Sequence, residues 1–349
     1  MKKYKIGICG HFGGEKNFFD GQTIKTKILY EEIGNILGDE KLSKVDTYRW
    51  KQRIFKLLNE CIKLAKECEH IVIILSVNGR NVFLPFFYFM KLLFKCKVHC
   101  MVIGGGFPIQ MKSNKFVNFF AKKIDGIYVE TNWMIKELDK LGYKNVHIIN
   151  NFKRLDVVNK EDLNFNYSEP FKICTFSRVC KEKGIEDIID VIKQINNKNQ
   201  KNIFELDIYG QIEKGYEAEF DNIKKSFPDY IKYKGIVEYD KSVDIIKDYF
   251  MLAFPTKYKT EGVPGTIIDA YAAGVPVIAS KWDSCNDVID ENKTGILYEF
   301  DNKLELMKIL EQIPNECEKV NAMRCNCIDK ANEYLVDNVI KKFLEKLSI

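Results

Sequence analysis

The chain has 349 residues, of which 46% are hydrophobic and 30% charged, with a formal net charge of +5. This composition supplies enough apolar side chains for two cores of ordinary domain size and excludes an intrinsically disordered chain. No run approaches the ~20 consecutive apolar residues that a membrane-spanning helix needs, and the first residues lead directly into a strand-like run without signal-peptide features. We therefore expect a cytoplasmic protein.

The eleven cysteines are scattered, odd in number and without a Cys-x-x-Cys pair. Cys9, Cys100 and Cys174 each lie in an apolar strand-like run, which is typical of reduced thiols in a core. We expect neither disulfides nor a cysteine zinc site. The sequence also contains no Asp-x-Asp motif, so no metal site is expected.

In the first half of the chain, apolar strand-like runs alternate with helical periodicity. The strand-like runs are 5–9, 71–76, 98–103, 126–130 and 146–149, and the helical stretches lie around 23–36, 50–68, 83–95, 112–123 and 132–141. Such alternation predicts an open parallel α/β sheet.

Glycine-rich segments follow two of these strands. The first is a long loop that leads into a helix and includes His11, Gly13, Gly14, Gly21 and Gln22. Its glycine spacing is not that of a dinucleotide fingerprint, so a plain surface loop remains an alternative, and a lone loop histidine is more often a bystander. The second, centred on Gly105, ends a strand at the carboxyl edge of the predicted sheet, where open α/β sheets bind ligands.

The two halves of the chain differ in charge. Residues 1–155 carry 27 Lys/Arg against 14 Asp/Glu, or +13, which leaves 27 against 35, or −8, for residues 156–349. Residues 70–124 contain eight cations interleaved with aromatic side chains, and no Asp or Glu. That composition suits a helix on an anionic membrane surface, but also a core helix with solvated lysines. Both interpretations stay open for 112–124, whereas Pro85 and the many Phe residues favour a core helix over 83–94.

A second series of strand-like runs follows. These are 171–176, 204–209, 231–234, 251–254, 275–279 and 295–297, with helical stretches between them. Polar residues dominate 150–166, where apolar periodicity stops. We therefore predict two doubly wound α/β domains, residues 1–152 and 167–329, followed by a C-terminal helix within 330–349.

Residues 254–280 carry the strongest chemical signal. Glu261 and Asp269 flank a Gly/Pro turn that opens a helix, and the first helical residues would be Gly265, Thr266 and Ile267. The unpaired N–H groups of such a turn can hold a phosphate without a cationic side chain. Taken alone, Glu261 could be a solvated loop acid and Asp269 a charge that favours the helix start by about 0.3–1 kcal/mol.

A basic loop after the strand at 171–176 adds a second signal. Arg178 and Lys183 precede an amphipathic helix, so they could hold a diphosphate, the first as a bidentate fork and the second as a mobile point charge. Considered alone, both could equally be ordinary surface cations.

The two signals together resemble the donor-site signature of family 4 retaining glycosyltransferases (group 1, GT-B fold), particularly members of bacterial polysaccharide assembly. The matching segments are 261–269 with the following Ala-Tyr-Ala-Ala-Gly-Val-Pro-Val-Ile, and the Ser-Arg-x-x-x-x-Lys-Gly of residues 177–184. The family more often has Glu where this chain has Asp269. The resemblance implies two Rossmann-like domains facing across a cleft, and a C-terminal helix that packs back on the first domain.

The resemblance also implies roles for single residues. Glu261, Arg178 and Lys183 form the expected catalytic set, in which Glu261 contacts the donor sugar and the two cations hold the diphosphate. Asp269 is expected on the nucleotide ribose. The other expected donor-binding residues are Gly262, Pro264, Gly265, Thr266, Ile267, Gly210, Gly235 and Val237. The expected phosphate and acceptor cleft is formed by His11, Gly13, Gly14, Gly21, Gln22 and Gly105.

The expected activity is the metal-independent, retaining transfer of a hexose-type sugar from a nucleotide diphosphate. UDP is expected rather than GDP as the nucleotide, and no further cofactor is expected. The expected acceptor is a lipid-linked saccharide or another glycan in surface polysaccharide or glycoconjugate assembly. The basic first domain suggests peripheral binding to the inner face of the cell membrane, and no nucleic acid is expected because no nucleic-acid motif is present. The alternatives are an NAD-dependent two-domain oxidoreductase and a catalytically idle glycosyltransferase-like scaffold.

Overall fold

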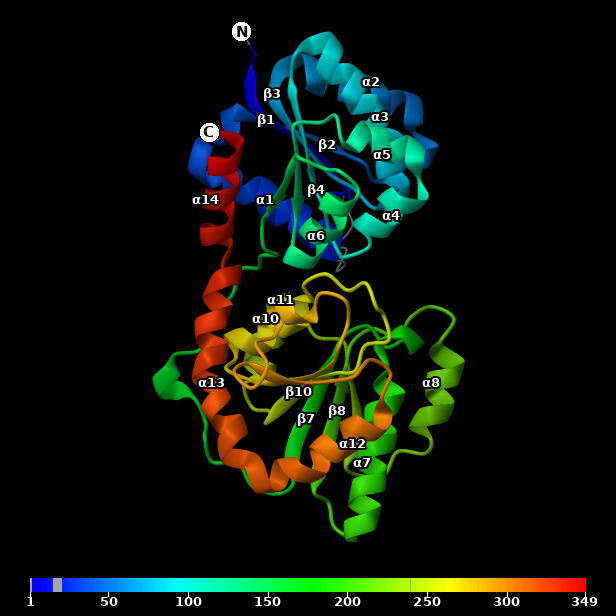
Figure 1. Ribbon diagram of the computed structural model, residues 1–349, viewed down its shortest axis with the longest axis vertical. Coiled ribbons are helices and arrows are strands. Elements are labelled where there is room, and N and C mark those ends of the chain that lie inside the picture. The colour runs from blue at the N-terminus through cyan, green and yellow to red at the C-terminus, as the bar shows by residue number, and fades with distance from the viewer. Residues whose placement is uncertain (1, 15–20, 239) are drawn as a thin grey trace. The chain divides into compact units, whose positions relative to one another are not determined.

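The computed structural model describes residues 2–14, 21–238 and 240–349, which form two compact units (Figure 1). Unit 1 comprises Met1–Lys153 and Leu335–Ile349, and unit 2 comprises Arg154–Tyr334. The polar segment that sequence analysis placed between the domains packs with unit 2, where the Val158 N–H donates to the Ala272 carbonyl at 2.9 Å.

Unit 1 contains a six-stranded parallel sheet in the order β2-β1-β3-β4-β5-β6. Its strands are β1 (Tyr4–Gly10), β2 (Leu42–Asp46), β3 (Cys68–Ile74), β4 (Lys97–Met101), β5 (Gly126–Val129) and β6 (Val146–Ile148). Sequence analysis missed β2, because this edge strand pairs only with β1 and its two apolar residues form no run. Because β2 adds a strand to the predicted series, the glycine-rich segment around Gly105 follows the fourth strand of the sheet, β4.

Helices cover both faces of this sheet. They are α1 (Gly21–Leu37), α2 (Ile54–Glu67), α3 (Val77–Phe94), α4 (Phe107–Ser113), α5 (Lys115–Ala121), α6 (Asn132–Lys140) and α14 (Val336–Leu347). One core lies beneath α2 to α6, and the other is closed by α1 and α14, where Phe343 meets Tyr128 edge-to-face at 4.9 Å. Alternate side chains of each strand supply the two cores, as expected for a doubly wound sheet.

Two helices of unit 1 differ from their predicted extents. Helix α3 begins at Val77 instead of residue 83 and accommodates Pro85 in its interior. The stretch predicted as one helix over 112–123 is two short helices, because Asn114 interrupts it and caps α5 by accepting a hydrogen bond from the Val117 N–H at 3.1 Å.

Unit 2 contains a second six-stranded parallel sheet, in the order β12-β11-β10-β7-β8-β9. Its strands are β7 (Phe171–Phe176), β8 (Phe204–Tyr209), β9 (Ile231–Gly235), β10 (Met251–Phe254), β11 (Val277–Ser280) and β12 (Gly295–Tyr298). All six overlap the predicted strand-like runs. The larger helices are α7 (Ile185–Asn199), α8 (Glu217–Lys224), α10 (Gly265–Ala272), α12 (Lys303–Gln312) and α13 (Cys317–Ala331), and α9 (Ser242–Ile246) and α11 (Cys285–Val288) are short.

The chain between the units does not continue as the single helix predicted from about residue 330. Helix α13 ends at Ala331, a short 3-10 turn follows at Asn332–Tyr334, and α14 starts at Val336. In the ranges that the structure describes, none of the helices is both long and apolar enough to cross a membrane.

Candidate active site

Lys183 and Glu261, which lie 78 residues apart in sequence, meet at the carboxyl edge of the sheet in unit 2. The Lys183 ammonium donates a hydrogen bond to Glu261 Oε1 and lies 5.1 Å from the centroid of the Phe254 ring. The Lys183 and Glu261 side chains are only 14% and 12% exposed. This pair combines the basic-loop signal and the acid signal of the sequence in one place.

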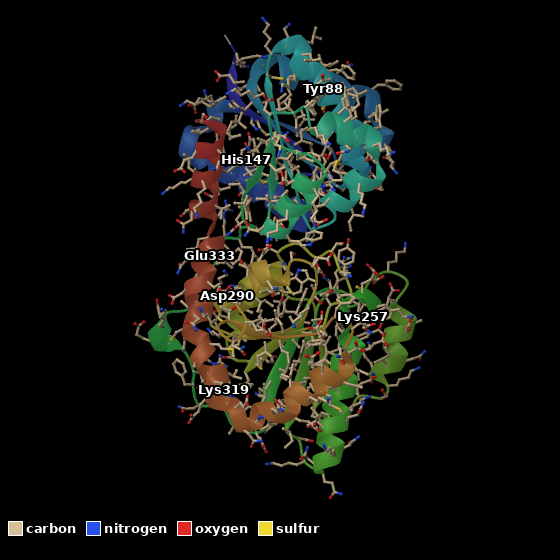
Figure 2. All side chains as sticks on the ribbon, viewed as in Figure 1. Tyr88, His147, Lys257, Asp290, Lys319 and Glu333 are labelled. Atoms are coloured by element: carbon tan, nitrogen blue, oxygen red, sulfur yellow. The ribbon has the colours of Figure 1, made fainter. Side chains whose placement is uncertain are left out.

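A close backbone contact brings the two segments together. Gly184 has a φ of +64°, and a Cβ at this position would lie 1.9 Å from the carbonyl oxygen of Pro255. Only glycine tolerates both conditions. Beside it, the Lys257 N–H donates to the Glu182 carbonyl at 2.8 Å. Lys257, labelled in Figure 2, reinforces the contact with its ammonium 2.9 Å from Asp187.

Neighbouring groups fix the orientation of Glu261. Thr256 Oγ1 donates to Glu261 Oε1 at 3.0 Å, while Ser284 Oγ donates to the Glu261 carbonyl at 2.9 Å. The buried Trp282 in turn donates its indole N–H to Ser284 Oγ at 3.0 Å. Since both side-chain donors reach Oε1, and no residue in the described ranges donates to Oε2, the second carboxylate oxygen can accept a ligand hydroxyl.

Helix α10 begins directly after Pro264 and presents free donors at its first turn. The N–H groups of Ile267 and Ile268 both point to the Pro264 carbonyl, at 3.1 and 3.4 Å, so in the described structure the unbonded N–H groups are those of Gly265 and Thr266. Thr266 Oγ1 is buried without a hydrogen-bond partner. A phosphate oxygen could satisfy these three donors. The prediction that the Ile267 N–H helps to hold the phosphate is corrected, because this N–H is already bonded to the Pro264 carbonyl.

The other residues of the acid motif are enclosed. Asp269 lies on the second turn of α10 and is only 4% exposed, and Gly262 offers its carbonyl to Ser284 Oγ at 3.5 Å. The ribose contact expected of Asp269 stays a prediction.

Arg178 does not join the Lys183–Glu261 pair. Its side chain is 66% exposed, and its guanidinium lies 2.8 Å from Glu213 Oε1. A diphosphate would have to compete with this carboxylate for Arg178, although an exposed ion pair of this kind stabilises by only about 0–1 kcal/mol.

One group of potential metal ligands is found among the described residues. Cys180, Glu182 and Glu213 bring one ligand atom each within 4.8 Å of one another. Burial raises the pKa of the Cys180 thiol, which disfavours the thiolate that binds metals, and Glu213 already pairs with Arg178. Metal independence stays a prediction.

Two of the glycines expected to bind the donor, Gly210 and Gly235, are bonded to each other. The Gly210 N–H donates to the Gly235 carbonyl at 2.8 Å, and the Gly210 carbonyl accepts from the Tyr233 hydroxyl at 2.8 Å. A Cβ on Gly210 would lie 1.7 Å from the Ser177 carbonyl. Gly210 therefore permits a close loop contact instead of presenting free backbone groups. Val237, which is partly buried, follows in the next strand-end loop.

The glycine-rich loop of unit 1 is held by Asp46. The Asp46 carboxylate at the end of β2 accepts hydrogen bonds from the Phe12 N–H at 2.9 Å and the Gly14 N–H at 2.8 Å. Gly13 and Gly14 both have positive φ. Residues 15–20 of this predicted loop lie outside the described residues.

The remaining predicted residues of unit 1 occupy the same sheet edge. His11 Nδ1 lies 2.7 Å from Thr23 Oγ1, and Gln22 on the first turn of α1, just after Gly21, donates to the Ile74 carbonyl at 3.3 Å. Gly105 lies in the turn between β4 and α4 and is buried. Their roles stay predictions.

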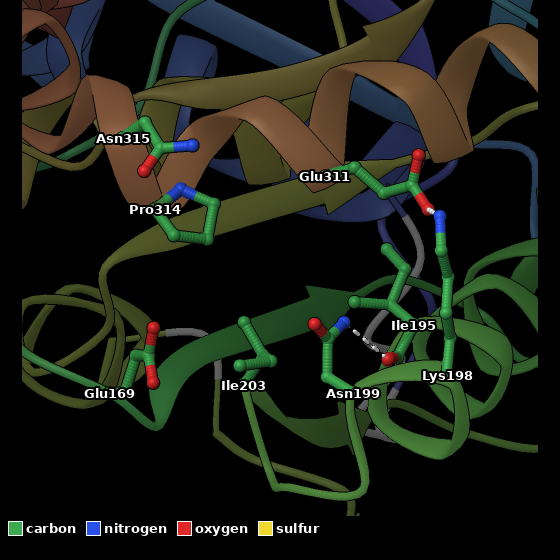
Figure 3. A pocket seen from close by; sticks show the side chains of 8 residues that line it. All are labelled: Glu169, Ile195, Lys198, Asn199, Ile203, Glu311, Pro314 and Asn315. Atoms are coloured by element: carbon green, nitrogen blue, oxygen red, sulfur yellow. Dashed lines mark hydrogen bonds and ion pairs between the residues drawn. The ribbon is translucent and has the colours of Figure 1, made fainter.

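A separate pocket of unit 2 lies away from these groups. It has a volume of about 350 Å³ and is lined by Glu169, Ile203 and residues of α7 and α12 (Figure 3). Glu169 and Ile203 lie just before β7 and β8, at the amino edge of the sheet. Lys198 and Glu311 pair across it at 2.7 Å. This pocket is therefore not part of the candidate active site.

Comparison with solved structures defines the fold class of the protein. Over 99% of both chains, the structure is similar to Anabaena Alr3699/HepE, solved in complex with UDP, with a TM-score of 0.77 and 13% identity. It is similarly close to sucrose-phosphate synthase of Thermosynechococcus elongatus, with a TM-score of 0.76 and 13% identity over 98% of both chains. The chain therefore has the GT-B fold of glycosyltransferases, which confirms the predicted fold class.

The family follows from the sequence comparisons. Residues 159–330 match the model of the family described as glycosyl transferases group 1. The chain is 24% identical over 256 residues to "Uncharacterized glycosyltransferase MJ1069" of Methanocaldococcus jannaschii, and the match covers 66% of this chain and 62% of that protein. The chain thus spans less than two thirds of this curated relative. The match to the group 1 glycosyl transferases thus covers most of unit 2, which contains the candidate active site.

Proposed function

We propose that the protein transfers a hexose-type sugar from UDP to a glycan acceptor with retention of anomeric configuration and without a metal. The observation that carries this proposal is the Lys183–Glu261 pair, held by Thr256 beside the free donors of α10. UDP is favoured over GDP because HepE is described in complex with UDP and with UDP-glucose.

In this proposal each group has a distinct task. Lys183 and the first turn of α10 stabilise the charge that develops on the leaving diphosphate, and Arg178 adds a cation once it leaves Glu213. Glu261 Oε2 accepts a hydroxyl of the donor sugar and so fixes its ring, while Asp269 binds the ribose. The acceptor hydroxyl attacks from the face that the diphosphate leaves, and a phosphate oxygen takes the proton.

A thermal-shift experiment tests the donor. We expect UDP or a UDP-sugar to raise the unfolding midpoint, since a ligand at 100 times its Kd stabilises by about 2.7 kcal/mol. The shift should persist in EDTA and be smaller with GDP. A shift with NAD alone would establish the oxidoreductase alternative. Nucleotide binding without turnover of any UDP-sugar would favour the idle scaffold, and a product of inverted anomeric configuration would contradict the retaining mechanism.

We further propose that the acceptor is lipid-linked and that unit 1 binds an anionic bilayer through one face. This face is formed by aromatic rings that surround Phe120, namely Phe89 of α3 and Phe116 and Phe119 of α5, at centroid distances of 4.9–5.6 Å. All three are more than half exposed, as are Leu92 and Leu93. Tyr88, labelled in Figure 2, also contacts Phe120.

The charge around this face matches the proposed partner. The flanking cations are Lys112, Lys115, Lys122 and Lys123. Exposed rings rimmed by lysines suit the interface of an anionic membrane, where rings insert and ammonium groups meet headgroups. Phe83, Phe87 and Val117 of these helices lie in the core, so the core-helix interpretation describes their buried side, and the proposed membrane surface is the opposite, exposed side.

Vesicle flotation tests this surface. We expect the protein to bind vesicles containing phosphatidylserine, and Phe116→Glu with Phe119→Glu to weaken binding at least about tenfold, because two rings lose their apolar burial. Phe55→Glu, at an 82% exposed phenylalanine outside the ring cluster, is the matched control and should bind normally. Equal binding by the double variant, or no binding by the native protein, would exclude this membrane surface.

A further inference from the structure

Unit 1 contains a pocket of its own, and only His11 and Gln22 among its lining residues were expected to lie at a binding site. It has a volume of about 310 Å³ and lies at the carboxyl ends of β1, β2 and β3. Its walls include His11, Thr47, Tyr48, Arg49, Trp50 and Phe83. Pockets that take small ligands have this size or more, with apolar walls and a few convergent polar groups.

The wall formed by residues 47–50 is fixed before any ligand arrives. Asp46 Oδ1 accepts the Tyr48 N–H at 2.8 Å, in addition to the two N–H groups of the glycine-rich loop. The Thr47 N–H donates to the Gly10 carbonyl at 2.8 Å, and the Trp50 N–H to the Thr47 carbonyl at 3.0 Å. The segment is thus bonded to the end of β1 and cannot shift freely.

Arg49 is held in an unfavourable backbone conformation within this wall. Its φ of 53° and ψ of 33° are left-handed, which disfavours residues with a Cβ. The other non-glycine residues with positive φ in the described part of the chain are helix C-caps or are Asn or Asp, for which this conformation is common. Strain of this kind persists where the surrounding structure imposes it, and it clusters at ligand sites.

The charge of Arg49 has no acidic partner among the described residues. None of the described residues that line the pocket is Asp or Glu, and Arg49 forms no ion pair with them. Its guanidinium instead lies over the Tyr48 ring at 5.2 Å, and Tyr48 meets the His11 ring edge-to-face at 5.8 Å. A guanidinium that is stacked in this way, and that forms no ion pair with the described residues, is arranged to bind a carboxylate or a phosphate in bidentate fashion.

The rest of the pocket suits a sugar ring. Trp50 packs edge-to-face on Phe83 at 6.1 Å, so the wall is aromatic, and Gln22 and Ser76 add polar side chains. Resting on the proposed glycosyltransferase function, we propose that this pocket binds an anionic sugar unit of the acceptor, whose carboxylate or phosphate pairs with Arg49. The protein would thereby select charged acceptor glycans over neutral ones.

Binding of three probes in the presence of saturating UDP tests the proposal. Glucuronic acid, glucose 6-phosphate and glucose are titrated by calorimetry into the native protein and into Arg49→Gln. We expect at least one anionic sugar to bind at least tenfold more tightly than glucose, and Arg49→Gln to remove this preference. Which of the two anions binds identifies the carboxylate or the phosphate as the recognised group.

Two further variants separate recognition from folding. Lys51→Gln removes a neighbouring cation outside the pocket lining and should keep the preference for anions. Arg49→Gly relieves the left-handed strain, so it should lose the preference while its unfolding midpoint does not fall. A structural role for Arg49 would not produce this combination.

The outcomes distinguish the two proposals. If UDP raises the unfolding midpoint but the three sugars bind equally or not at all, the anionic acceptor subsite is excluded while the glycosyltransferase function stands. If anionic sugars bind in an Arg49-dependent way to a protein that recognises no nucleotide, the anion-binding role of the pocket is supported and the proposed glycosyltransferase function is excluded. An unchanged preference in Arg49→Gln would overturn the role of this residue.

Discussion

Lys183→Ala is expected to lower kcat for sugar transfer by about 10²- to 10³-fold, the usual effect of removing one preorganised group that stabilises developing negative charge. Lys183 lies against Glu261 and is only 14% exposed, so solvent screens its charge weakly. Glu261→Gln should lower kcat by a similar factor while UDP binding is nearly unchanged, because the proposed contact of this residue is with the sugar. Steady-state kinetics and the thermal shift with UDP measure the two effects.

Lys181→Ala is the matched control for this prediction. Lys181 lies on the same 3-10 turn (Lys181–Lys183), but its side chain is 63% exposed and pairs with Glu219 at 2.9 Å. We expect a change in kcat of less than about twofold, because exposed ion pairs contribute little. The assignment of the site would be wrong if Lys183→Ala kept a tenth or more of the native activity, or if Lys181→Ala were equally damaged.

The second large effect is expected from acid. His70 and His99 are buried side by side in unit 1, with His70 Nδ1 3.1 Å from His99 Nε2, and His99 Nδ1 lies 3.1 Å from the Tyr128 hydroxyl. Burial lowers the pKa of His70 to about 4 and that of His99 to about 3. Both rings are therefore neutral in the folded protein at pH values where an unfolded histidine is charged.

The direction of the pH dependence follows from proton uptake. Between about pH 6.5 and pH 4 the unfolded state binds protons that the folded state does not, so the free energy of unfolding falls as the pH falls. The pKa change of His70 alone corresponds to about 3 kcal/mol over this window. Urea unfolding monitored at pH 7, 6 and 5 should show a steadily decreasing midpoint.

Two variants locate the source of this sensitivity. His99→Gln removes one titrating ring and should flatten the dependence of the urea midpoint on pH. Tyr128→Phe removes a hydrogen bond to His99 but leaves both rings, so the protein should be less stable with the slope unchanged. A slope that His99→Gln leaves intact would show that other groups cause the acid sensitivity.

Several features of the protein could be predicted from local sequence. The central strand β10 and its neighbour β11 are buried along their whole length and appear as apolar runs, and the Gly/Pro turn before α10 is a local backbone signal. For this reason the fold class, the six strands of unit 2 and the start of α10 at Gly265 were all predicted. Strand β2 was missed because an edge strand needs few apolar residues.

Other features depend on residues that are distant in sequence. The charges of Lys183 and Glu261 are visible in the sequence, but their hydrogen bond depends on the contact of Gly184 with Pro255, which only the folded β10 and α7 create. Likewise, the sequence could not show that the Gly210 N–H is already bonded to Gly235, since that bond joins the ends of two neighbouring strands.

The sequence by itself thus determined the class of fold and the residue types of the candidate donor site, because periodicity and short motifs express local geometry. The tertiary structure decided which of these groups meet and which retain free donors. It alone revealed the role of Asp46 and the pocket around Arg49, because these arise where the ends of β1, β2 and β3 converge. Convergence of parallel strand ends is a property of the sheet, and no single segment of sequence encodes it.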